Sequence, residues 1–282
     1  MSTQVRCAEL SELAGESLEA TASTTQSWLL VEVPDTWSRD VSDGNGLPDT
    51  ALRAVRAWLE RTPSSRLLFI RRPGRGREER TLAFVVHAAP SRRRVHRFEL
   101  AQLDDLDLDE SGADETGSQL VLVCGHGTRD ACCALRGTAV YGALASSLAP
   151  EQVWLSSHQG GHRFAANVLV LPSAVQLGRV SAAEATTVVA RALAGRIELD
   201  HFRGRPTYPP EVQAADIAVR RAFCLDGLDD LHFVEADGGT VRFRDARGRE
   251  HVAIAEQRSG PFVPASCGAE PEPQVAFSAR VV

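Results

Sequence analysis

Short apolar runs separated by polar turns dominate the first part of the chain and predict an α/β fold. Four such runs predict strands, at 27–33, 66–71, 80–87 and 95–100. The run at 27–33 is almost wholly apolar, which is typical of a strand buried on both faces. Between the first two runs, an apolar stripe of helical period predicts a helix over 49–61, and a shorter helix is expected over 9–19. Residues 1–117 are therefore expected to form an N-terminal α/β half with the order β-α-β-β-β.

The second part of the chain repeats this alternation. Its predicted strands lie at 119–124, 152–156, 167–171 and 175–179. Helices are predicted over 131–148 and 182–194, and Gly195 stands where a helix C-terminal glycine belongs. A β-α-β-β-α unit within this series is thioredoxin-like in order, and we expect such a unit over 118–205. The two halves can be interpreted as a degenerate pair of these units, although no residue-level repeat is visible.

The boundaries of these regions follow changes in composition. The acidic run at 104–117 is interpreted as a linker between the halves, with a solvated loop inside one domain as the alternative. Residues 206–282 are expected to form a small C-terminal α+β extension. Its predicted elements are a loop at 203–210, a helix at 210–223 and three short strands at 231–235, 240–244 and 251–255. The last 25 residues, rich in Pro, Glu and Ala, are expected to form a tail with little structure.

Composition and charge narrow the class of protein. The 282 residues are 43% hydrophobic and 24% charged, as in an ordinary globular protein, and the net charge of −6 disfavours nucleic acid as a partner. No apolar stretch approaches the roughly 18 residues of a membrane-spanning helix, and no signal peptide is recognisable. We therefore expect a cytoplasmic protein without a membrane partner. Six cysteines in such a chain are more often metal ligands, redox thiols or buried residues than structural disulfides.

The segment CGHGTRDACC begins at Cys124, directly after the predicted strand LVLV. A cysteine at a strand end projects toward the region where ligands bind in α/β folds. Gly125 and Gly127 allow the backbone to turn tightly and to bring amides close to an anion. Cys132 and Cys133 are expected in the first turn of a helix, where the helix dipole favours thiolate over thiol. Local chemistry leaves open which of these two is a ligand.

A second polar segment, SSHQGGHRF, follows the predicted strand EQVWL. His158 and His162 are four residues apart, but Gly160 and Gly161 between them disfavour a helix and favour a loop that turns both imidazoles toward one centre. Together with the cysteines, the histidines predict a four-ligand metal site at two adjacent strand ends. Thiolate and imidazole ligands suit zinc or an iron–sulfur cluster, and the residues alone leave both open.

The combined motif resembles the sucrase/ferredoxin-like family. Cys124-x8-Cys133 followed by His158-Gln-Gly-Gly-His162 matches the family pattern C-x8-C…H-x-(G/S)-G-H, and the likeness is best over 119–205. The resemblance implies a thioredoxin-like ferredoxin domain that carries a [2Fe-2S] cluster. It favours Cys133 over Cys132 as the second thiolate. By analogy with Rieske centres, Cys124 and Cys133 would hold one iron, and His158 and His162 the exposed outer iron.

The resemblance favours an electron carrier over an enzyme, with a redox partner protein that the sequence does not identify. Two rivals remain: a metal-free thiol redox protein, and a binding module with a structural Cys2His2 zinc site. Five arginines have two possible interpretations. They bind an anion or a partner protein, or they belong to a solvated turn or a structural ion pair. These residues are Arg71, Arg72, Arg75, Arg129 and Arg163. The isolated cysteines are assigned no role: Cys7, Cys224 and Cys267.

Overall fold

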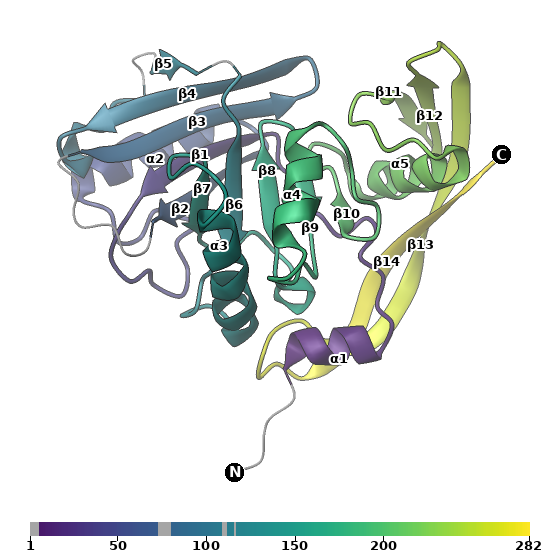
Figure 1. Cartoon of the computed structure of the whole chain (residues 1–282), viewed down its shortest axis with the longest axis horizontal. Coiled ribbons are helices and arrows are strands. Elements are labelled where there is room, and N and C mark those ends of the chain that lie inside the picture. The colour runs from purple at the N-terminus through teal and green to yellow at the C-terminus, as the bar shows by residue number, and fades with distance from the viewer. Residues whose placement is uncertain (1–5, 73–79, 109–111, 116) are drawn as a thin grey trace.

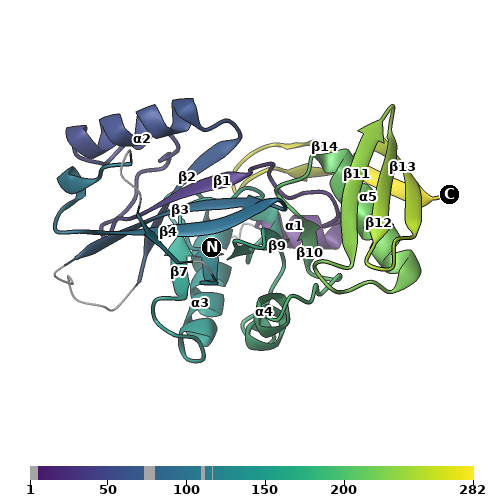
Figure 2. The same ribbon diagram turned by 90° about the horizontal axis from the view of Figure 1, so that it is seen from above.

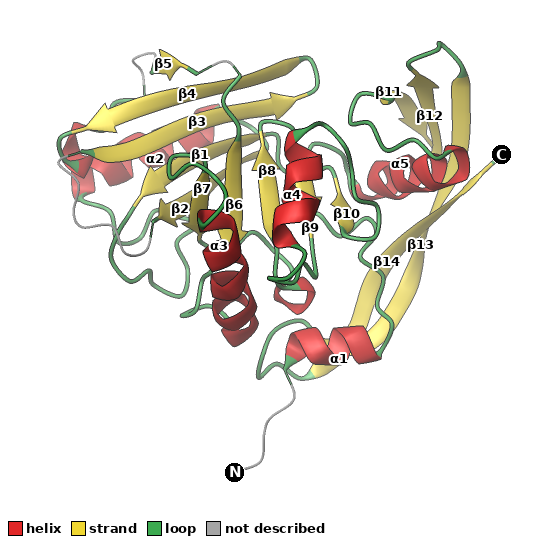
Figure 3. Ribbon diagram, viewed as in Figure 1, coloured by secondary structure: helices red, strands yellow, loops and turns green. Residues whose placement is uncertain are grey.

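The computed structural model describes residues 6–72, 80–108, 112–115 and 117–282 as a mixed α/β protein with one large and one small sheet (Figures 1 and 3). Across the large sheet the strands run in the order β10 (Phe202–Gly204), β9 (Val175–Leu177), β8 (Val168–Leu171), β6 (Leu120–Cys124), β7 (Val153–Ser156), β2 (Ser65–Arg71), β1 (Ser27–Glu32), β3 (Thr81–Ala89), β4 (Arg92–Leu100) and β5 (Ala113–Asp114). The predicted α/β class and the predicted strands of both halves are confirmed.

The two halves contribute the same four-strand arrangement. In the first half the order is β2-β1-β3-β4, with β1 parallel to β2 and antiparallel to β3. In the second half the order is β7-β6-β8-β9, with β6 parallel to β7 and antiparallel to β8. Antiparallel pairing of β2 with β7 joins the halves into one sheet. Within the acidic run, Ala113 and Asp114 form β5, which pairs with β4 at the sheet edge.

The helices are α1 (Cys7–Leu13), α2 (Asp49–Arg61), α3 (Thr138–Ala145), α4 (Ala185–Leu193) and α5 (Pro210–Phe223). A π-helical turn, η2 (Cys133–Gly137), leads into α3, and short 3-10 turns occur at η1 (Leu103–Asp105) and η3 (His162–Phe164). The predictions for α2 and α5 match the observed bounds. The first helix is shorter than predicted because Gly15 adopts a left-handed φ of 63° shortly after it ends.

Both faces of β1, in the large sheet, are buried, as predicted for the strand at 27–33. Leu29 and Phe69 lie in one apolar cluster, which includes residues of α2, α3 and α4. Trp28 and Leu68, one position earlier on their strands, lie in the opposite cluster. There the ring of Trp154 on β7 lies 5.8 Å from that of Phe84 on β3. Because two strands separate β7 from β3, this contact shows that the sheet curls strongly on that face.

The C-terminal region forms a second sheet at one end of the large one (Figure 2). Its strands are β11 (Leu231–Asp237), β12 (Thr240–Asp245), β13 (Glu250–Pro264) and β14 (Pro271–Val281), packed against α5. The prediction of a tail over the last 25 residues is wrong, because β13 and β14 form a long antiparallel hairpin. The predicted loop at 203–210 is also partly wrong, since β10 extends to Gly204. In the β13–β14 hairpin, backbone pairing outweighs the prolines because they stand near the hairpin turn and on an edge strand.

The tip of the β13–β14 hairpin reaches α1, so the first helix and this C-terminal hairpin lie side by side (Figure 1). The Gly/Arg turn predicted at 72–78 falls almost entirely outside the described residues. None of the helices in the described ranges has the length and apolar character needed to cross a membrane.

Candidate metal centre

The two predicted ligand segments leave the large sheet at neighbouring strand ends. β6 and β7 are parallel, and Cys124 at the end of β6 is paired with Ser156 at the end of β7. The carboxyl ends of parallel strands point the same way, so both loops emerge at one edge of the sheet. The sequence prediction of adjacent strand ends is therefore confirmed.

A helix that packs tightly on β6 positions the second cysteine. Residues 131–132 begin a helical segment that continues as the π-helical turn from Cys133 to Gly137. Gly137 lies directly against the backbone of Cys124, and a Cβ at this position would overlap the carbonyl oxygen of Cys124. Only glycine allows the helix to approach the strand this closely. π-helical turns are rare, and they occur frequently at functional sites.

Three of the four predicted residues lie in one compact group, and the fourth is close by. The ligand atoms of Cys124, Cys133 and His158 are within 4.8 Å of one another. Nδ1 of His162 is 3.7 Å from Sγ of Cys133, and the rings of His158 and His162 stack with centroids 3.8 Å apart. Sγ of Cys132 instead lies 3.6 Å from Sγ of Cys7, away from this group. The geometry thus separates Cys133 from Cys132.

Electrostatics put the group in states suited to metal binding. A hydrogen bond from the Cys133 thiol, with a smaller contribution from His158, holds the pKa of Cys124 well below its ordinary value. The same hydrogen bond raises the pKa of Cys133. Burial, reinforced by the neighbouring His158, lowers the pKa of His162 to about 4. These shifts favour the thiolate of Cys124 and the neutral imidazole of His162, the forms that bind metals.

Buried polar contacts fix the histidine loop. Arg66 on β2 donates to the carbonyl oxygens of His158 and Gln159, both at 3.1 Å. The ring of His126 accepts a hydrogen bond from the backbone N–H of His158 at 3.2 Å, while its other nitrogen lies 2.8 Å from the carbonyl oxygen of Ser38. The first half of the chain thus helps to shape the site in the second half.

A buried arginine completes the loop's support. Arg203 on β10 donates to the carbonyl oxygen of Gly160 at 2.9 Å and to Oδ1 of Asn167 at 2.7 Å. It also donates to the hydroxyl of Thr21 and to the carbonyl oxygen of the same residue. Gly160 and Gly161 have left-handed φ angles of 98° and 71°, so the turn that brings His162 back to the centre depends on glycine.

Residues 18–204 match the Sucrase/ferredoxin-like family. The chain belongs to this family. The chain is also similar to altered inheritance of mitochondria protein 32 of Meyerozyma guilliermondii, with 28% identity over 125 residues. That match covers 41% of this chain and 43% of the fungal protein, so the chain spans less than half the length of this relative. No solved structure matches the chain significantly.

This sucrase/ferredoxin-like protein has a surface cavity next to His158. A cavity of about 160 Å³ is lined by His158 together with Arg39, Arg66 and Arg129. His158 is partly exposed, whereas His162 is buried. Arg129 lies 3.8 Å from Asp40 in an exposed ion pair at the same rim. The rim of the site therefore carries a cluster of basic side chains.

The other predicted basic residues have structural partners. Arg163 forms a 2.8 Å ion pair with Glu16 and lies over Phe164. Arg72 pairs with buried Glu32 at 3.1 Å. Arg71 donates to the carbonyl oxygen of Asp35 at 3.2 Å and lies 4.5 Å from the ring centroid of Trp37. Arg75 lies outside the described residues.

Three positioning residues were not assigned by the sequence analysis: Arg66, His126 and Arg203. Arg66 and Arg203 lie far from the ligands in sequence and reach the loop only through the sheet order. His126 lies within the CGHG segment, so its place beside a ligand was a usable signal. Its role as an acceptor for the other loop depends on the pairing of β6 with β7.

Proposed function

We propose that this sucrase/ferredoxin-like protein transfers single electrons through a [2Fe-2S] cluster. The observation that carries the proposal is the convergence of two cysteines and two histidines at neighbouring strand ends. The thiolates of Cys124 and Cys133 would hold one iron, and the imidazoles of His158 and His162 the other. When bound, such a cluster accepts and releases one electron at a time.

The chemistry and spread of the donor atoms fit this group. Nδ1 of His158 is buried and has no hydrogen-bond partner among the described residues, as expected for a nitrogen that awaits a ligand. Cys124, Cys133 and His158 form one compact group, whereas His162 joins Cys133 and Asp130 in a second, overlapping group. A single tetrahedral zinc ion would hold all four donor atoms within about 4 Å of one another. Two overlapping groups favour a wider centre with two metal ions.

The surroundings of the cysteines support a group that gains negative charge. Arg203 is fully buried, and its hydrogen bonds within the described ranges go to neutral acceptors on Thr21, Gly160 and Asn167. Its charge interacts with the side chains of Cys124 and Cys133. A buried cation without a carboxylate partner would stabilise the reduced, more negative form of a cluster.

The strand order and the basic rim support the remaining parts of the proposal. The β7-β6-β8-β9 arrangement with flanking helices supports the thioredoxin-like interpretation of residues 118–205. Arg39 and Arg129 next to the partly exposed His158 favour an acidic redox partner that docks at this rim. The cytoplasmic location and the boundaries at 117 and 205 stay predictions.

Iron and sulfide analysis of the full chain, purified without oxygen, tests the proposal. We expect a red-brown protein with about two irons and two sulfides per chain. Replacing His158 with alanine should reduce iron content, while the matched change His232→Ala, at an exposed position on β11, should leave it unchanged. A colourless protein that carries one zinc at this centre would overturn the cluster assignment.

A further inference from the structure

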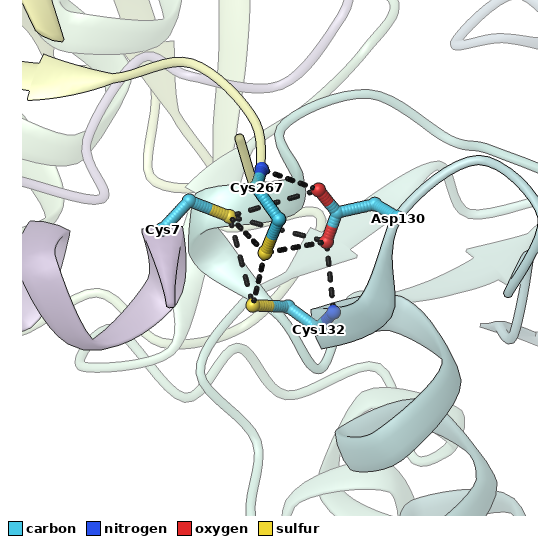
Figure 4. A group of neighbouring side chains, drawn as sticks. All are labelled: Cys7, Asp130, Cys132 and Cys267. Carbon is cyan, nitrogen blue, oxygen red and sulfur yellow. Dashed lines mark hydrogen bonds between the residues drawn. The ribbon is translucent and has the colours of Figure 1, made fainter. Parts of the chain in front are cut away.

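Three cysteines and one aspartate meet where α1 and the β13–β14 turn reach the helical segment that carries Cys133, here called the ligand helix (Figure 4). Cys7 is the first residue of α1, and Cys267 lies in the turn between β13 and β14. Asp130 and Cys132 stand at the start of the helical segment that carries Cys133. Segments separated by more than 120 residues thus place their reactive side chains together, and no residue of this group except Asp130 belongs to the centre described above.

The four side chains form a compact, nearly regular group. The sulfur–sulfur distances are 3.6 Å for Cys7–Cys132, 3.4 Å for Cys132–Cys267 and 3.5 Å for Cys267–Cys7. The carboxylate oxygens of Asp130 lie 3.8 and 3.9 Å from Sγ of Cys7, and one lies 3.6 Å from Sγ of Cys267. Cys7, Cys132 and Asp130 are buried, and Cys267 is partly exposed at the rim.

We infer that Cys7, Asp130, Cys132 and Cys267 form a second metal site that takes a single zinc ion. With zinc–sulfur bonds of about 2.3 Å and a zinc–oxygen bond of about 2.0 Å, a tetrahedral ion places two sulfurs about 3.8 Å apart and a sulfur and an oxygen about 3.5 Å apart. The observed separations lie within a few tenths of an ångström of both values. Thiolate and carboxylate donors suit zinc.

The carboxylate of Asp130 is oriented as a ligand requires. The backbone N–H of Cys132 donates to one oxygen and the backbone N–H of Cys267 to the other, both at 2.8 Å. These hydrogen bonds fix the plane of the carboxylate and leave lone pairs directed at the sulfurs, as outer contacts do in metal sites. A carboxylate among three thiols is otherwise an unfavourable neighbour, because it opposes formation of thiolates.

Two other uses of the cysteines fit the geometry less well. A disulfide joins only two sulfurs at about 2.05 Å and would leave the third thiol and Asp130 without a role. A polynuclear cluster would spread the thiolates over several metal atoms, which needs more space than this triangle offers. A single ion uses all four residues and fastens α1 and the C-terminal hairpin to the ligand helix. This inference does not depend on which metal the first centre holds.

Metal analysis of the full chain, purified under reducing conditions from zinc-supplemented medium, tests the second site. We expect the wild type and the control variant Cys224→Ser, whose cysteine is exposed and outside the group, to carry about one zinc per chain more than Cys267→Ser. Cys267→Ser should lose that zinc and keep any iron and sulfide. Equal zinc content in Cys267→Ser and in the wild type would overturn the inference, as would a wild type without zinc.

Thiol alkylation followed by mass spectrometry gives a test that needs no variant. In the zinc-loaded wild type, Cys267 should react at least tenfold more slowly than Cys224, and a chelator should abolish the difference. If Cys267 is equally protected before and after chelation, packing alone shields it. If Cys267 and Cys224 react equally fast in the zinc-loaded protein, Cys267 is unprotected. Either result, or a disulfide within the group under reducing conditions, would overturn the site.

Discussion

Gly137 holds the helix that carries Cys133 against the strand that carries Cys124, so its replacement by alanine should separate the two thiolates. The added Cβ would overlap the carbonyl oxygen of Cys124, lie 3.0 Å from its carbonyl carbon and lie 3.5 Å from Cα of Gly125. Cys124 cannot turn away, because its N–H is bonded to the carbonyl oxygen of Asn167 at 3.0 Å within the sheet. The helix must therefore move.

The size of this movement follows from ordinary contact distances. Non-bonded carbons prefer separations of about 3.5–4.0 Å, so the helix must withdraw by about 1 Å to relieve the overlaps. Metal–ligand distances tolerate about 0.2 Å, so the withdrawal is several times what a metal centre accepts. Overpacking of this kind costs about 1–3 kcal/mol. At about 2–4 °C per kcal/mol, we expect Tm to fall by about 2–12 °C.

The assay compares Gly137→Ala with Gly142→Ala, which lies in α3, the continuation of the same helix. A Cβ at Gly142 meets no atom within 4 Å, so this control should keep its iron and gain up to about 1 kcal/mol of stability from better helix propensity. Iron and sulfide per chain and Tm are measured for both variants and the wild type. Wild-type iron content and Tm in Gly137→Ala would refute the claim that this contact sets the spacing of the two cysteines.

Three further predictions concern buried charge. Arg203→Gln should lower the reduction potential by on the order of tens of millivolts at an effective dielectric constant of about 20, and Arg203→Lys should restore it; equal potentials in both variants would argue against a charge effect. In the metal-free protein the pKa of His162 falls from 6.5 to about 4 on folding, so the unfolded chain binds the proton more readily between these values. Stability in urea should therefore decrease as pH drops through this window, and an equally steep profile in His162→Gln would exclude this residue as the cause. Arg220→Met should lower the free energy of unfolding by about 3–5 kcal/mol because it strands buried Asp216, 3.0 Å away; adding Asp216→Leu should recover part of the loss, and no recovery in urea titrations would contradict this explanation.

The elements around the centre were predictable because their signals are local. Apolar runs that end in Cys124 or shortly before His158 predict strands followed by functional loops, and the glycines after them predict tight turns. The parallel pairing of β6 with β7 then brings the two loops together, as α/β geometry requires. Nothing local separates Cys132 from Cys133, however. They are neighbours on one helix and differ by about 100° in direction, so their roles depend on what packs on each side.

The C-terminal hairpin was missed for a related reason. A strand on a sheet edge needs only backbone pairing along one side, and the segment 271–281 contains two prolines and one glutamate that lower its intrinsic strand propensity. Once this hairpin is treated as a tail, Cys267 has no defined position and cannot be associated with Cys7, which lies 260 residues earlier. Arg203 illustrates the same limit, because its partners are set by the sheet order and not by its neighbours in sequence.

The two proposed centres share one stretch of backbone, and this sharing has a consequence for assembly. Cys132 faces Cys7 and Cys267, while Cys133 faces Cys124 and His162. Asp130 has ligand atoms close to both groups. A zinc ion at the second site would fix the helix start and thereby restrict the position of Cys133 before a cluster is bound. α1 and the C-terminal hairpin would then affect how readily the cluster assembles without contacting it, because they hold in place the turn from which one of its thiolates projects.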